Sequence, residues 1–327
     1  MENKSQNKEE EDNEVNVTID QTEDPIYYVN GDFIDITEFP GYSQYDEKKI
    51  CCFNVAYFPN LKTYFIGQWE IIPWLPFFVF LLAISAFVVN TVIGISVFSL
   101  TEIIIITIVL FLLLFMFLFN FILVIYEGPG YYPFSLVHDN GNPPTQWAGI
   151  QSSLEQYSWV QLQSRPPRSA FFRSAHRYVL RPDHFCGWTS TWVGKRNYKF
   201  FILFNFYGML YLILFTIYII RSLIYYAYPL QLCASLIFAL IYTVLGAFFA
   251  FMTGNFFFSS LFHSLKNETS WEIWNHIDNT KFKKANWKEN LQDVFGDVNM
   301  FLWLCPVSPW RNKTNTEISA GYVTYDD

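Results

Sequence analysis

The sequence predicts an all-α membrane protein with four transmembrane helices and a loop domain between the second and the third. Of its 327 residues, 52% are hydrophobic and 15% are charged. A soluble domain could not bury the 35 Phe, 21 Tyr and 11 Trp side chains. Four segments carry no formal charge and reach the roughly 20 apolar residues that cross a bilayer. They span residues 71–100, 103–126, 200–220 and 229–262.

Each of these segments is expected to be a helix, because it is too long for a typical strand and its apolar residues do not alternate. Pro73 and Pro76 suit the start of the first helix. The first and last segments exceed the length of one crossing, so they must tilt, bend or protrude. Thr101 and Glu102 are expected to close the first hairpin, and residues 221–228 the second.

The membrane segments form two pairs, 71–126 and 200–262, that divide the rest of the chain into three regions. These are a tail over 1–70, a loop domain over 127–199 and a C-terminal region over 263–327. The net charge is −8, and acidic residues crowd the first 50 positions. The first part of the tail is therefore expected to be disordered. It has no apolar h-region, so no cleaved signal peptide is expected.

The basic residues are divided unevenly and predict the orientation. The loop domain carries eight Lys and Arg residues, which are Arg165, Arg168, Arg173, Arg177, Arg181, Lys195, Arg196 and Lys199. The C-terminal region also has seven Lys and Arg residues, whereas the second hairpin has only Arg221 and the first has none. Positive charge stays on the cytosolic side of a membrane. Both termini and the loop domain are therefore expected in the cytosol.

One short stretch of the loop domain contains residues suited to acyl transfer. Asp183, His184 and Cys186 lie within four residues. A thiol nucleophile needs a base to take its proton, and the base needs a group that orients it. Each residue also has a structural interpretation, since a lone cysteine is usually a small buried hydrophobe and an aspartate can cap a turn.

The surrounding residues resemble the cysteine-rich domain of the DHHC protein S-acyltransferases. The matching positions are 165–169 (Arg-Pro-Pro-Arg-Ser), Val179, Asp183, His184, Cys186, Trp188, Val193, Gly194, Asn197 and Phe201. Residues 128–130 (Gly-Pro-Gly), 269–272 (Thr-Ser-Trp-Glu) and 290–296 are similar to the family's flanking motifs. The resemblance covers roughly 71–306, including the four-span layout with a cytosolic catalytic loop.

The resemblance implies a protein-cysteine S-palmitoyltransferase. Cys186 would take a long-chain acyl group, expected to be palmitoyl, from acyl-CoA and pass it to cysteines of membrane-associated proteins. His184 would act as base and Asp183 would orient it. Arg165, Arg168, Arg181, Lys195 and Arg196 are candidates for binding the CoA phosphates. The partners would be acyl-CoA, protein substrates and the bilayer, without nucleic acid, in Golgi, endoplasmic reticulum or plasma membrane.

The sequence departs from the family at every zinc-binding position. By spacing, these positions hold Ser158, Gln161, Phe171, Phe172, Ala175, Tyr178, Phe185 and Trp192, none of them a usual zinc ligand. A structural zinc contributes about 10–16 kcal/mol in small finger peptides. Burying the five aromatic replacements would contribute about 7–15 kcal/mol. We therefore expect no metal and an aromatic cluster in its place.

Two alternatives remain open from the sequence. A degenerate family member could act as a membrane scaffold or regulatory partner, as the loss of all zinc ligands suggests. The retention of Asp183, His184 and Cys186 together speaks against it. An unrelated transporter or channel would carry ionisable residues within its spans, and the four segments have almost none.

Overall fold

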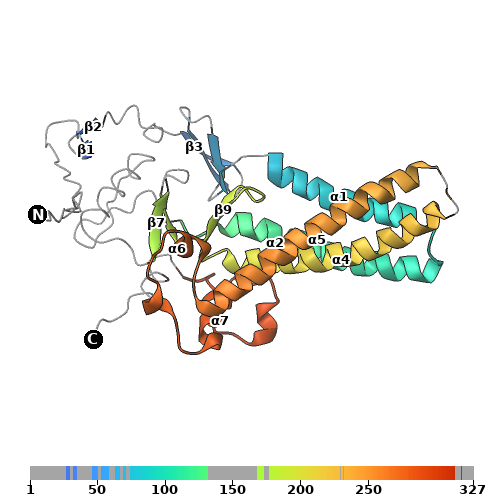
Figure 1. Ribbon diagram of the computed structural model, residues 1–327. Helices are drawn as coiled ribbons and strands as arrows, with labels where there is room; N and C mark the ends of the chain where they lie inside the picture. Colours follow the sequence, from blue (N-terminus) through green and yellow to red (C-terminus); the bar gives the residue numbers. More distant parts are fainter. Residues whose placement is uncertain are drawn as a thin grey trace, which may run out of the picture.

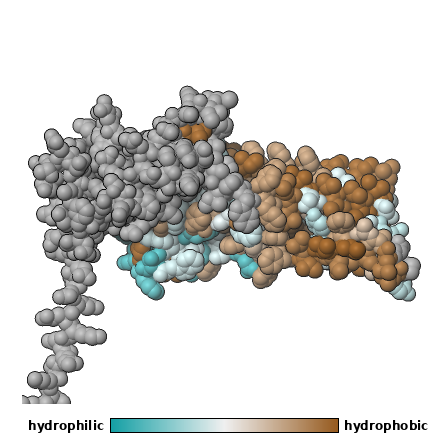
Figure 2. All heavy atoms as spheres, turned by 90° about the horizontal axis from the view of Figure 1, so that it is seen from above, coloured by the Kyte–Doolittle hydropathy of each residue, from teal (hydrophilic) through white to brown (hydrophobic). Residues whose placement is uncertain are grey.

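A computed structural model describes residues 74–131, 168–172, 177–228, 230, 232–313 and 318, together with short strands between residues 27 and 70. Within these residues, four helices are long and apolar enough to cross a membrane. They are α1 (Trp74–Gly94), α2 (Leu100–Glu127), α4 (Tyr198–Ala227) and α5 (Ala234–Lys266). The helices run side by side as one elongated bundle (Figure 1), whose surface is predominantly hydrophobic (Figure 2). The four predicted spans each coincide with one helix.

The helix ends differ from the prediction where local hydrogen bonds decide them. The first helix stops at Gly94, and residues 95–99 make the reversal. Thr101 and Glu102 lie within α2 rather than in the hairpin turn, because Ser99 and Glu102 form a capping box. Helix α4 continues to Ala227, beyond the predicted end at residue 220. Arg221 is tolerated there because it pairs with Glu102 at 3.1 Å.

Helix α4 is the centre of the bundle and contacts the other three helices. Its contact with α2 is largely aromatic, with the rings of Phe117 and Phe204 stacked at 5.2 Å. Its contact with α5 depends on small residues. A side chain at Gly246 would meet Thr216 Oγ1 at 2.6 Å and the Phe215 ring at 3.0 Å. Close backbone approach of this kind is the usual way in which helices pack in a membrane.

The loop domain corrects the all-α prediction. Strand β7 (Ser169–Phe172) pairs with β8 (Arg177–Leu180), and β9 (His184–Cys186) pairs with β10 (Thr191–Val193), both antiparallel. Strands of three or four residues are too short to give a periodic signal in the sequence. Further strands precede α1: β1 (Tyr27–Val29), β2 (Asp32–Ile34), β3 (Asp46–Ile50), β4 (Phe53–Phe58), β5 (Thr63–Ile66) and β6 (Trp69–Glu70). The first 26 residues lie outside the described residues.

The C-terminal region folds back onto the end of the bundle that carries the loop domain (Figure 1). It contains α6 (Ser270–Trp274), η2 (Thr280–Phe282), α7 (Trp287–Phe295) and η3 (Met300–Trp303). Helix α7 is amphipathic and buries Leu291, Val294 and Phe295 in the same core as the helix ends. The loop domain and the C-terminal region therefore share one end of the molecule.

The contact between α4 and α5 yields a stability prediction with a matched control. Gly246→Ala should lower the thermal unfolding midpoint in nanodiscs, because the added methyl group overpacks the contact at a cost of about 1–3 kcal/mol. Gly254→Ala on the same helix meets only Met209 at 3.5 Å. It should be neutral or slightly stabilising, since Ala favours a helix by about 1 kcal/mol over Gly. Equal midpoints for the two variants would contradict the packing.

Candidate active site

The β9–β10 hairpin places His184 and Cys186 on one face. Alternate residues of a strand point to the same side, so positions 184 and 186 lie together while Phe185 points outward and is 41% exposed. The ladder pairs Cys186 with Thr191 and His184 with Val193. Strand alternation thus brings the thiol and the imidazole together.

Asp183 is buried and holds the imidazole. Its Oδ2 lies 2.7 Å from His184 Nδ1, and its Oδ1 accepts a hydrogen bond from the Ser270 backbone N–H at 2.9 Å. Burial alone would raise the pKa of this carboxyl. The hydrogen bonds from His184 and Ser270 and the charges of His184 and Arg181 outweigh burial and lower the pKa. Asp183 is therefore ionised and fixes the orientation of the ring.

His184 and Cys186 form a charge-stabilised pair. Burial would lower the pKa of His184, but hydrogen bonds to Asp183 and Cys186 raise it to about 10. Burial would raise the pKa of Cys186, but the hydrogen bond and charge of His184 lower it. Both shifts favour an imidazolium beside a thiolate, the nucleophilic form of cysteine. The rings of Phe201 (5.1 Å, edge-on) and Phe256 (6.4 Å, stacked) enclose the imidazole.

Thr189 is a site residue that sequence reasoning missed. It is fully buried in the turn of the hairpin, where its N–H and hydroxyl both donate to the Cys186 carbonyl at 3.2 and 3.3 Å. Hydrogen bonds from Thr189 also lower the pKa of the Cys186 thiol. Its position three residues after Cys186 is the feature of the sequence that could have identified it. Phe256 of α5 also contacts the site and was not singled out from the sequence as a site residue.

Cys186 opens onto an apolar cavity inside the bundle. The cavity is lined by α1, α2, α4 and α5 together with Cys186 and Trp188, and its empty space of about 800 Å³ includes space open to the surroundings. Its inner walls include Ala83, Tyr211, Phe215 and Gly246. With hardly any polar group on its walls, the cavity suits an extended hydrocarbon chain whose end reaches the thiol.

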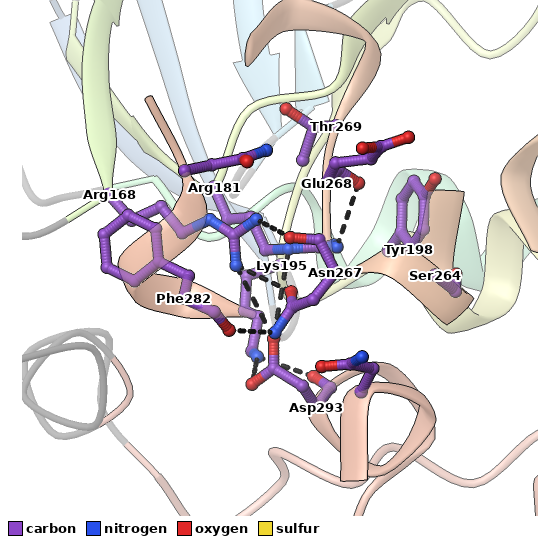
Figure 3. A network of polar contacts seen from close by, with 12 residues as sticks. Arg168, Arg181, Lys195, Tyr198, Ser264, Asn267, Glu268, Thr269, Phe282 and Asp293 are labelled. Atoms are coloured by element: carbon purple, nitrogen blue, oxygen red, sulfur yellow. Dashed lines mark hydrogen bonds and ion pairs between the residues drawn. The ribbon is translucent and has the colours of Figure 1, made fainter. Parts of the chain in front are cut away.

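Three of the predicted CoA-binding cations are buried instead in a network that joins the loop domain to the C-terminal region (Figure 3). Arg168 makes a bidentate pair with Glu272 of α6 at 2.7 and 2.9 Å. Lys195 Nζ lies 2.6 Å from Asp293 Oδ1 of α7, and Arg181 Nε lies 4.0 Å from Asp293 Oδ2. The burial of these side chains argues against direct contact with CoA phosphates.

The charges of this network modify one another. Burial and the neighbouring arginines lower the pKa of Lys195 to about 7, although Asp293 opposes the shift. Despite its own burial, Asp293 has its pKa lowered to about 2 by Lys195, Arg181 and Arg168. Arg196 is partly exposed and contacts Glu127 and the Lys313 carbonyl. Arg165 lies outside the described residues, so a CoA role for these last two arginines stays a prediction.

The flanking motifs have structural roles. Thr269 and Glu272 form a capping box at the start of α6, which presents the Ser270 N–H to Asp183. Asn290 Nδ2 donates to the Leu265 carbonyl at 2.9 Å, and its Oδ1 accepts from the Lys284 N–H. Asn290 thus connects α7 to the backbone at the end of α5 and to the segment that precedes α7.

Aromatic rings occupy the described positions at which the family resemblance implies zinc ligands. The Phe172 and Trp192 rings are 3.7 Å apart between centroids, and Phe185 meets Trp192 edge-on at 6.1 Å. Trp271 of α6 adds an edge contact to Phe172 at 5.8 Å. Within the described residues, no group of three or more His, Cys, Asp or Glu could hold a metal. These side chains therefore do not fit a zinc ion.

Some of the predicted cluster cannot be located. The side chains of Phe171 and Tyr178 lie outside the described residues, although their backbones pair across β7 and β8. Ser158, Gln161 and Ala175 also lie outside them. Two unpredicted residues contribute instead, since Trp271 contacts Phe172 and Tyr131 packs with Val179 and Trp192.

A polarised thiol at an apolar, membrane-embedded cavity defines an integral-membrane acyltransferase that handles lipid chains. Comparison with known proteins agrees. The family model described as DHHC palmitoyltransferase matches residues 151–277. Probable protein S-acyltransferase 12 of Arabidopsis thaliana is 31% identical over 205 residues, which cover 57% of this chain and 67% of that protein. The chain belongs to the DHHC palmitoyltransferase family.

The chain covers a smaller share of other relatives. Probable protein S-acyltransferase 14 of Arabidopsis thaliana is 28% identical over 209 residues, covering 57% of this chain and 66% of the relative. Palmitoyltransferase PFA3 of Yarrowia lipolytica is 25% identical over 181 residues, covering 44% of each chain. The family and these relatives support protein-cysteine S-acyltransferase activity, and they do not favour a scaffold role.

The charge pair predicts how Cys186 reacts with alkylating agents. The pH midpoint of its alkylation by iodoacetamide should lie below the value of about 8.5 for a free cysteine. His184→Gln should move the midpoint above that value, because burial then acts on the thiol without an imidazolium. Peptide mass spectrometry over a pH series measures the midpoint, with glutathione in the same sample as the reference for a free thiol. An unchanged midpoint in the variant would exclude the pair.

Proposed function

We propose that this protein transfers a long-chain acyl group from acyl-CoA, through an acyl-Cys186 intermediate, to cysteines of membrane-associated proteins. The observation that carries the proposal is the position of Cys186. It lines an apolar cavity between the four long helices, and it is hydrogen-bonded to His184. A structural cysteine would need neither the cavity nor the oriented imidazole.

The geometry supports a two-step exchange in which each proton has a carrier. The Cys186 thiolate attacks the thioester carbonyl carbon of acyl-CoA, and the bond from that carbon to the CoA sulfur breaks. The leaving CoA thiolate takes the proton held by His184. Neutral His184 then accepts the proton of a substrate thiol, whose sulfur attacks acyl-Cys186 and releases the Cys186 thiolate. Asp183, fixed by Ser270, stabilises the imidazolium whenever it forms.

The sidedness of the protein follows from charge. The loop domain and the C-terminal region, which hold most of the basic residues, occupy the same end of the bundle. Cytosolic loops carry the excess of Lys and Arg. We place this end, with the active site and both termini, in the cytosol, where acyl-CoA and cytosolic cysteines meet. Golgi, endoplasmic reticulum and plasma membrane fit this topology equally.

We further propose that ring packing replaces zinc in the loop domain. The Phe172 ring contacts both the Trp192 ring and the Trp271 ring. These contacts connect β7 and β10 to α6. The buried pair of Arg168 and Glu272 joins the same two regions. Together, these contacts connect the strands that metal ligands would otherwise connect.

Acyl labelling tests the proposed nucleophile. Wild-type protein incubated with palmitoyl-CoA should gain a label that neutral hydroxylamine removes, as expected of a thioester. Cys186→Ser should abolish this label, whereas Cys305→Ser, a control at a cysteine outside the site, should keep it. Measurement of the label by mass spectrometry assigns it to one residue. A label of equal size on the Cys186→Ser variant would refute the acyl-Cys186 intermediate.

Metal analysis and ring truncation test the proposed replacement of zinc. Purified protein should hold far less than one zinc per chain, and a chelator should leave its thermal midpoint unchanged. Trp192→Ala should cost about 3–5 kcal/mol, because the buried ring contacts both Phe172 and Phe185. Phe185→Ala, at an outward-facing ring, should cost clearly less. Stoichiometric zinc in active protein would refute the proposal.

A further inference from the structure

The segment that follows α7 exposes a series of large apolar side chains. They are Met300, Phe301, Leu302, Leu304 and Val307, with Phe301 84% exposed. Soluble surfaces rarely expose contiguous apolar residues in this way without a partner. The opposite side of the segment is fixed to the protein by Trp303, which stacks on Phe295 at 5.4 Å and donates to the Gly296 carbonyl.

Two side chains of α4 hold this segment along the helix. Lys199 Nζ donates to the carbonyls of Leu302 and Val307, both at 2.9 Å. Tyr207 Oη donates to the Leu304 carbonyl, also at 2.9 Å. Lys199 and Tyr207 are about 12 Å apart along the helix axis. The segment therefore runs beside the end of α4 that carries the loop domain, and it reaches more than two turns toward the middle of the helix.

The depth of Tyr207 can be estimated from the charged boundary at the other end of α4. The exposed pair of Arg221 and Glu102 marks that surface of the bilayer. A hydrocarbon core of about 30 Å corresponds to about 20 helical residues. Counting back from Arg221 reaches Phe201, so Tyr207 lies inside the core. The Leu304 carbonyl that it binds lies at the same depth.

Four backbone carbonyls of the segment accept hydrogen bonds from protein donors, as suits a non-aqueous setting. In hydrocarbon, each carbonyl needs a protein donor because water is absent. The Leu302 carbonyl accepts from Lys199 and from the Cys305 N–H, and the Leu304 carbonyl accepts from Tyr207. The Cys305 carbonyl accepts from the Val307 N–H, and the Val307 carbonyl accepts from Lys199. Residue 306 is a proline and has no N–H to satisfy.

We propose that residues 300–307 are a membrane-embedded anchor that inserts Phe301 and Leu304 into the lipid leaflet on the side of the active site. The occupant of this surface is lipid, because the segment continues the lipid-facing surface of α4 at the same depth. Through Trp303 and Phe295 the anchor holds α7, whose Asp293 binds Lys195 of the loop domain. The inference depends on the helices crossing a bilayer and is independent of the acyl-transfer reaction.

Site-directed spin labelling in phosphatidylcholine nanodiscs tests the anchor. The five native cysteines are replaced by serine, and one cysteine is introduced in turn as Phe301→Cys, Leu304→Cys, Phe258→Cys or Lys288→Cys. Phe258 is an exposed residue of membrane helix α5, and Lys288 is exposed on the polar part of α7. Oxygen partitions into lipid, whereas a water-soluble nickel complex does not. Labels at 301 and 304 should therefore be at least several-fold more accessible to oxygen than to the nickel complex, as the label at 258 is expected to be.

Two results would overturn the anchor. Nickel accessibility at 301 and 304 equal to that at Lys288 would place the segment in water. Low accessibility to both reagents would mean that protein, such as a second copy of this chain, covers it. Tyr207→Phe provides an independent check, since loss of the bond to the Leu304 carbonyl should raise nickel accessibility at 304 and leave that at Phe258 unchanged. Unaltered accessibility at 304 in this variant would count against the proposed depth.

Discussion

The buried carboxylate of Asp183 is the group on which the rest of this structure depends. A carboxylate can remain ionised in a buried position only if hydrogen bonds and nearby charges replace its hydration. Here the His184 imidazole is hydrogen-bonded to Oδ2 of the carboxylate, and the Ser270 N–H donates to Oδ1. Ser270 is in place because Thr269 and Glu272 cap α6, and Glu272 is itself held by Arg168. The orientation of the His184 imidazole is thus set by a chain of contacts that crosses from the loop domain to the C-terminal region.

The same contacts explain why so many charges are buried near a membrane surface. Removing one member of a buried pair leaves a charge without compensation, which usually costs more than the pair itself contributes. Arg168, Lys195, Glu272 and Asp293 therefore have to stay together, and they fix α6 and α7 against the strands. Ring contacts of Phe172 with Trp192 and with Trp271 join the same strands to α6.

The sequence predicted the membrane helices well, because about 20 consecutive apolar residues leave few alternatives. It predicted their ends less well, because hydropathy does not detect the capping box at Ser99 or the ion pair of Arg221 with Glu102. It identified Asp183, His184 and Cys186 as candidates, and the structure brings them together. It could not predict the buried network, whose partners Arg168 and Glu272 are 104 residues apart. The basic side chains were instead interpreted as ligands of CoA, because burial is not visible in a list of charges.

The scarcity of sulfur in the loop domain has a consequence for redox chemistry. Cys186 is the only cysteine between positions 127 and 199. A loop built around thiolate-bound metal exposes several sulfurs to oxidants, and oxidation of any of them can release the metal and unfold the loop. In the loop domain of this chain peroxide has a single cysteine as its target, the proposed nucleophile Cys186. Sulfenic acid formation there would stop turnover while the rings and ion pairs keep the fold, so an intact protein could be restored by reduction.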